Sequence, residues 1–202
     1  MPASVGKNEV FNMALGFAGC RQIGSPDERT PEAIQCALHW DRVRRGVLRD
    51  HPWAFATERR TLAQTDMPEA YSKEWRYSYG MPDPALRIVA VHSGAVRNRR
   101  AKEPFAVVRH DGQQIILSDV PSAVCDCIVD VQDLSAWDEL AIMAAARRLA
   151  AAIAVALLRN NGGKVTELQK LAQMEFPDAA GVDAAEQRID RPDLDSWLAA
   201  RG

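Results

Sequence analysis

The chain has 202 residues, 47% hydrophobic and 26% charged, which is the ordinary range of a globular protein of about one domain. Its formal net charge of −2 argues against a dedicated nucleic-acid binder, because such proteins carry a strong basic excess. Four cysteines are too few for a disulfide scaffold, and "MPASVGKNEV" has no apolar signal-peptide core, so we expect synthesis in a reducing, intracellular compartment.

Two helices are predicted in the first quarter of the chain. The run "NEVFNMALGFAG" has the spacing of a short amphipathic helix. Thr30 as N-cap and Pro31 at the first helical position begin a second helix. Its expected apolar side consists of Ile34, Leu38, Trp40, Val43 and Val47. Because Pro52 disfavours helical geometry at the preceding residue, this helix should end at about His51.

The middle of the chain, residues 53–132, has a different character. An aromatic connection, "YSKEWRYSYGMPDPALR", precedes short β-branched runs such as "FAVVRH" and "QQIILSD". Asp111 and Gly112 lie between two apolar runs and predict a hairpin with a two-residue turn. We therefore expect a small antiparallel β layer here.

Helical patterns return after residue 133. Ser135 is the expected cap of a long alanine-rich helix that reaches Leu158, and "NNGG" should end it. Thr166 and Gln169 have the spacing of a capping box that opens another helix. A short alanine-rich helical piece and a polar tail complete residues 177–202.

The predicted fold is mainly α: a bundle of about four helices, with a small antiparallel β layer inserted into it. Residues 1–52 and 133–176 form the bundle, 53–132 the aromatic connection and β insert, and 177–202 the C-terminal helix and tail of one domain. The long apolar helix carries Arg147 and Arg148 at its middle, which would cost several kcal/mol in a bilayer core, so no membrane span is expected.

The pattern of reactive side chains predicts no enzyme, no cofactor and no metal. Cys125 and Cys127 lie on one face of a strand and could bind a metal, but two small buried side chains are the favoured interpretation. Asp126 and Asp130 form a carboxylate pair of the kind found on solvated faces. No nucleophile motif or phosphate-binding loop has the required spacing.

Arginines gather in two places, near the end of the second helix and in a basic loop. They are either a solvated surface or a surface for an acidic partner or phosphates. The near-zero net charge favours contact with a protein partner. The candidate interface arginines are Arg42, Arg44, Arg45, Arg49, Arg97, Arg99 and Arg100.

The order of several short motifs resembles a known family. After the helix end come His51, Pro52, Trp53, Phe55 and Ala56, then a Trp-x-Tyr-x-Tyr-x-x-Pro-x-Asp segment and a Leu-Arg pair. That segment and that pair are Trp75, Tyr77, Tyr79, Pro82, Asp83, Leu86 and Arg87. With the alanine-rich helix and the terminal "SWLAARG", this order resembles the tail tubular protein A family, the head-to-tail adaptors of short-tailed bacteriophages.

The resemblance implies a virion protein of the phage neck, made in the host cytoplasm. Twelve copies would form a ring between the portal protein and the tail nozzle, and double-stranded DNA would pass through its lumen without specific contacts. Trp197 and Leu198 are the expected anchors of a C-terminal tail that docks on the portal. The expected helix–sheet junction core consists of Pro52, Trp53, Phe55, Trp75, Tyr77 and Tyr79.

An alternative of another class is a small cytoplasmic α+β module that binds a ligand or regulates a partner. Such a module would need a concave pocket, and Trp53, Trp75 and Tyr79 are the aromatic side chains expected to line it.

Overall fold

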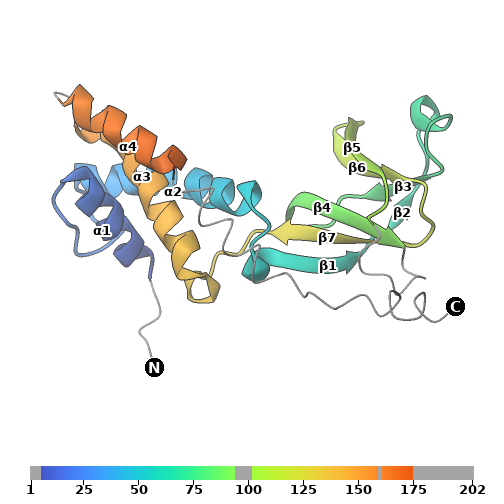
Figure 1. The fold of residues 1–202 in the computed structure, drawn as a ribbon, viewed down its shortest axis with the longest axis horizontal. Coiled ribbons are helices and arrows are strands. Elements are labelled where there is room, and N and C mark those ends of the chain that lie inside the picture. The colour runs from blue at the N-terminus through green and yellow to red at the C-terminus, as the bar shows by residue number, and fades with distance from the viewer. Residues whose placement is uncertain (1–5, 94–101, 159–160, 175–202) are drawn as a thin grey trace, which may run out of the picture.

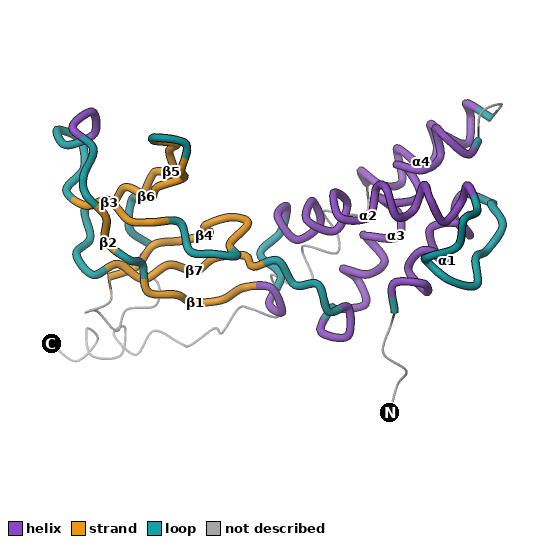
Figure 2. The backbone as a smooth tube through the Cα atoms, turned by 180° about the vertical axis from the view of Figure 1, so that it is seen from behind, coloured by secondary structure: helices purple, strands orange, loops and turns teal. Residues whose placement is uncertain are grey.

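The computed structural model describes residues 6–93, 102–158 and 161–174 (Figure 1). The helices among them are α1 (Lys7–Ala18), α2 (Pro31–Asp50), α3 (Glu139–Leu157) and α4 (Gly162–Met174). The strands are β1 (Thr57–Thr61), β2 (Gln64–Thr65), β3 (Tyr77–Gly80), β4 (Ala85–Ser93), β5 (Phe105–His110), β6 (Gln113–Ser118) and β7 (Ala123–Val129). The four helices lie at one end of an elongated molecule and the strands at the other (Figures 1 and 2).

The helices form a bundle around α3, which packs against α1, α2 and α4. Alanines let the neighbouring helices approach α3 closely, and Leu149 and Ile153 fill the centre without exposure to solvent. By length and composition, α3 is also apolar enough to cross a membrane, yet half of that apolar stretch is buried within the protein. Its apolar character therefore has an explanation in the bundle core.

The strands form two antiparallel sheets, with the orders β1-β7-β4 and β2-β3-β6-β5. Between β1 and β2 the chain passes from one sheet to the other: the Leu62 amide donates to Ala123 O (2.9 Å), and Ala63 O accepts from the Gly80 amide (2.9 Å). On the other side, Glu103 bridges to Val91 of β4 just before β5 begins. The two sheets are thus joined at both edges around a core of their own.

The expectation of a mainly α fold is wrong. The protein is an α+β fold with two antiparallel sheets, and the strands enclose a core separate from that of the bundle. Sequence patterns underestimated the sheets because β1 reads "TERRT" and β2 reads "QT", neither of which has an apolar side chain. These strands are held by backbone pairing to β7 and β3, which side-chain periodicity does not reveal.

Several local predictions are confirmed. Thr30 caps α2 by accepting a hydrogen bond from the Ala33 amide (3.4 Å), and the helix ends at Asp50, with His51 as its C-cap. Asp111 and Gly112 have φ of 47° and 81° and connect β5 to β6, as the hairpin signal predicted.

Three other local predictions are wrong. The N-cap of α3 is Asp138 rather than Ser135, because Asp138 accepts from the Leu140 amide at 2.7 Å. Helix α4 begins at Gly162, where Asn161 caps it, so Thr166 lies inside the helix. Ile34 and Leu38 face solvent and do not belong to the core side of α2.

Candidate functional site

The junction between the bundle and the sheets begins with the aromatic residues that follow α2. Trp53 is fully buried, and its indole Nε1 donates a hydrogen bond to Val47 O in the last turn of α2 (3.0 Å). The ring of Phe55 lies 6.0 Å from that of Trp53 and 5.3 Å from that of Trp137, between centroids. Three aromatic rings therefore connect the end of α2, the start of β1 and the approach to α3.

A buried ion pair is the second connection at this junction. Arg44 of α2 is 2% exposed and pairs with Asp130, which follows β7. Asp130 also accepts from Nε of Arg45 (3.1 Å), and Val131 O accepts from the indole of Trp137 (3.2 Å). Because Arg44 is buried in this contact, its guanidinium is not presented to an outside partner.

The other predicted junction aromatics lie in strand β3 or just before it. Tyr79 of β3 is fully buried in the sheet core, and its hydroxyl donates to Val120 O. Tyr77 packs against the same core, while Trp75 is half-buried and belongs to neither core. Since Trp53 and Tyr79 are buried in different cores, they do not line the common aromatic pocket that a ligand-binding module was expected to have.

The outward face of α2 carries the remaining predicted arginines that the structure describes. Arg42, Arg45 and Arg49 are exposed along this face, in one stripe with Ile34 (53% exposed) and Leu38 (69%). The surface is therefore apolar toward the start of the helix and basic toward its end. The other predicted interface residues, Arg97, Arg99, Arg100, Trp197 and Leu198, lie outside the described residues.

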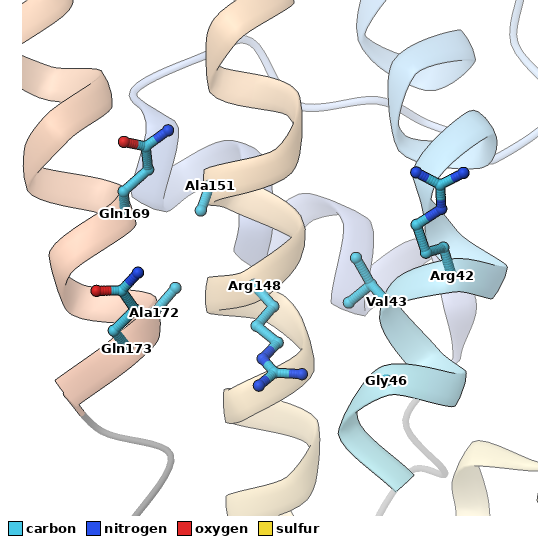
Figure 3. A pocket seen from close by; sticks show the side chains of 8 residues that line it. All are labelled: Arg42, Val43, Gly46, Arg148, Ala151, Gln169, Ala172 and Gln173. Carbon is cyan, nitrogen blue, oxygen red and sulfur yellow. The ribbon is translucent and has the colours of Figure 1, made fainter. Parts of the chain in front are cut away.

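A groove of about 820 Å³ lies on the bundle between α2, α3 and α4 (Figure 3). Its lining residues are Arg42, Val43 and Gly46 of α2, Arg148 and Ala151 of α3, and Gln169, Ala172 and Gln173 of α4. Arg148 passes close to α2, since a Cβ on Gly46 would lie 3.3 Å from its Nη1, and its Nη2 reaches Asp50 Oδ2 at 2.5 Å. This groove could not be predicted from local sequence patterns, because its residues come from three helices.

A charged cluster crosses the outer face of the sheet β1-β7-β4. Asp126 accepts two hydrogen bonds from Arg59 (2.7 and 2.9 Å), and its Oδ2 lies 2.8 Å from Nε2 of His92. Burial raises the pKa of Asp126, but the hydrogen bonds from Arg59 and His92 outweigh it, so the pKa lies below its ordinary value. The outward position of Asp126 could have been predicted from the alternation of side chains along a strand, since Asp126 lies between two buried cysteines.

The cysteines of β7 occupy the inner face of their sheet. Cys125 and Cys127 have no solvent exposure, and burial raises the pKa of Cys125 to about 12. No group of three or more His, Cys, Asp or Glu that could hold a metal ion occurs within residues 6–93, 102–158 and 161–174. In the structure, these two thiols are small core side chains.

No family model and no curated protein matches the chain. The resemblance to the tail tubular protein A family therefore stays a prediction.

Proposed function

We propose that the protein is a structural head-to-tail adaptor of a short-tailed bacteriophage, a ring subunit between the portal and the tail nozzle. The observation that carries this proposal is the location of the stretch from His51 to Ala56, whose order resembles the family. Trp53 and Phe55 of this stretch pack into the bundle core at the point where the chain enters β1. This part of the resemblance thus lies where the two halves of the molecule connect.

A ring places a strict geometric demand on such a connection. Head-to-tail contacts close into a ring only at a fixed rotation per subunit, so an angular error is repeated at every interface. Here the indole of Trp53 is hydrogen-bonded to Val47 O, which fixes the chain where it leaves the bundle, and a buried ion pair (Arg44 to Asp130) joins α2 to the residue after β7. Two different contacts at one junction restrict rotation more than either alone, which suits a ring subunit.

The outward face of α2 is the surface we assign to the neighbouring subunit or portal. Exposed Leu38 and Ile34 supply apolar area, while Arg49 supplies charge that favours an acidic partner. The slightly acidic chain as a whole suits a DNA channel, since every phosphate that a lumen neutralises adds affinity and so slows passage.

The proposal is tested by mixing the purified chain with the portal protein of the phage whose genome encodes it, followed by negative-stain electron microscopy. We expect twelve-fold rings seated on the portal. Leu38→Asp should abolish them without changing the circular dichroism spectrum, because it places a charge in the apolar part of the interface.

Leu140→Asp is the matched control, since Leu140 is also exposed (39%) but lies at the start of α3, outside the α2 face. This variant should assemble normally. Failure of the unmodified chain to bind the portal at all would contradict the adaptor function. Normal assembly of Leu38→Asp would contradict only the assignment of the α2 face.

A further inference from the structure

The groove on the bundle has a shape that could bind one more helix. Its lining is mostly apolar, it is open to solvent, and α3 forms its floor between α2 and α4 (Figure 3). Gly46, Ala151 and Ala172 are small, so the backbone of an occupant could approach the bundle closely. An occupant that presents small apolar side chains on one face would fill it.

The polar groups of the groove favour an acidic occupant. Arg42 and Arg148 bring guanidinium groups to it, and Gln169 and Gln173 bring amides that can donate hydrogen bonds. Among the residues that the structure describes, no carboxylate lines the groove, although Asp50 reaches Arg148 from beside it. Carboxylates on the flanks of a docked helix would therefore meet donors of complementary charge.

The chain itself contains a segment with this chemistry directly after α4. Residues 178–190 read "DAAGVDAAEQRID", with four carboxylates against one arginine. Val182, Ala185 and Ile189 recur at helical spacing and would form one apolar face if the segment is helical. The carboxylates at Asp183 and Glu186 would then lie beside that face.

The connection to this segment is short. The helix α4 ends at Met174, its residue Gln173 lines the groove, and only residues 175–177 separate it from Asp178. Helices joined by so short a link pack as antiparallel neighbours in bundles. A short tether also gives an intramolecular contact a high effective concentration.

We propose that the groove between α2, α3 and α4 binds the acidic segment 178–190 of the same chain, antiparallel to α4. The segment completes the bundle, with its apolar face on Ala151 and Ala172 and its carboxylates toward Arg42 and Arg148. This contact does not depend on the adaptor function, because it concerns the surface of one subunit before any assembly.

Hydrogen–deuterium exchange of the full chain, read by mass spectrometry, tests this contact. Amides of residues 178–190 should exchange about tenfold or more slowly than in an unstructured peptide of the same sequence, because a docked segment exchanges through local opening. Ala151→Trp, which fills the groove, should remove this protection. Leu171→Trp is the control, since Leu171 is exposed on α4 but does not line the groove.

A second pair of variants tests the charge argument without a change in packing. Arg42→Glu should reduce the protection severalfold, and less so at high salt, because it brings a negative charge to the acidic segment. Arg49→Glu changes the net charge equally, on the same helix, but outside the groove, and should leave the protection unchanged.

Three results would overturn the proposal. They are fast exchange of residues 178–190 in the unmodified chain, unchanged protection in both Ala151→Trp and Arg42→Glu, and protection that disappears on tenfold dilution. The last result would assign the contact to a second copy instead of the same chain. Unchanged exchange in β7 would show in each variant that the fold is intact.

Discussion

Arg44 of α2 and Asp130 beyond β7 form a buried ion pair across 86 residues of sequence, and it connects the helical bundle to the sheets. The side chain of Arg44 is 3% exposed and that of Asp130 is 9% exposed. Since water hardly reaches either charge, each is stabilised by the other. A pair of this kind adds little net stability compared with apolar residues, but the loss of one partner is costly.

Asp130→Ala should therefore destabilise the protein by about 3–5 kcal/mol, because it leaves the buried guanidinium of Arg44 with only the exposed Asp41, at 3.7 Å, as a counter-ion. Urea unfolding followed by circular dichroism measures this loss. Arg45→Ala is the control: Arg45 contacts the same carboxylate at 3.1 Å but is 59% exposed, so its loss should cost less than about 1 kcal/mol. Equal effects of the two substitutions would show that burial does not decide the role of Arg44.

Trp53 should be the most sensitive of the junction aromatics. Trp53→Ala should cost about 3–5 kcal/mol, because it opens a cavity in a fully buried site. Trp53→Phe keeps most of the ring but leaves Val47 O without its indole donor, and should cost about 1–3 kcal/mol.

Trp75→Ala is the comparison for Trp53→Ala, since Trp75 is half-buried and belongs to neither core. Trp75→Ala should lower the free energy of unfolding clearly less than Trp53→Ala does, when both variants are unfolded in urea under the same conditions. A larger loss of stability in Trp75→Ala than in Trp53→Ala would contradict the structure, in which Trp53 is the buried aromatic residue at the junction.

The two ends of α2 could be predicted from sequence because their signals are local. Thr30, Pro31 and Pro52 fix the two ends of α2 by capping and by the geometry of proline, and both ends are where the sequence placed them. Strand β1 could not be found this way. Its residues are polar, and Arg59 is stabilised there by Asp126, 67 residues further along the chain.

The predicted basic surface on α2 also shows that local sequence patterns do not reveal contacts across the fold. Sequence position suggested that Arg42, Arg44, Arg45 and Arg49 share one basic surface, but a helix turns by about 100° per residue, so Arg44 faces inward while its neighbours face out. Its partner Asp130 was visible in the sequence only as one of two acidic residues in "CDCIVDV". Pairing across a fold depends on tertiary distance, which no local pattern encodes.

Cys20 should be the thiol that reacts first in the folded protein. It is partly exposed, whereas Cys36, Cys125 and Cys127 have no solvent exposure. Burial raises the pKa of Cys36 to about 12, so little thiolate forms there at mildly alkaline pH. Alkylation with iodoacetamide, mapped by mass spectrometry, should label Cys20 in native protein and all four cysteines in urea. Native labelling should disappear in Cys20→Ser; rapid labelling of Cys125 would indicate that the sheet core opens.

Asp126 should make the stability of the protein depend on acid pH. Its pKa is lower in the folded state than the ordinary value of 3.8, because Arg59 and His92 hydrogen-bond the ionised carboxylate. A carboxyl of this kind contributes its full stabilisation above the ordinary pKa and loses it as the pH falls through the folded value. Since Arg59 is 48% exposed, we expect the Arg59–Asp126 pair to contribute about 1 kcal/mol to the free energy of unfolding at neutral pH.

The gap in unfolding free energy between the natural chain and Asp126→Asn should therefore be largest at neutral pH and shrink as the pH falls below about 4. Urea unfolding at a series of pH values measures this gap. Arg59→Gln removes the main hydrogen-bond donor, so an Asp126→Asn substitution added to it should have a smaller effect at neutral pH. A gap that widens in acid would mean that the folded protein prefers the protonated carboxyl, which is opposite to the direction that Arg59 and His92 impose.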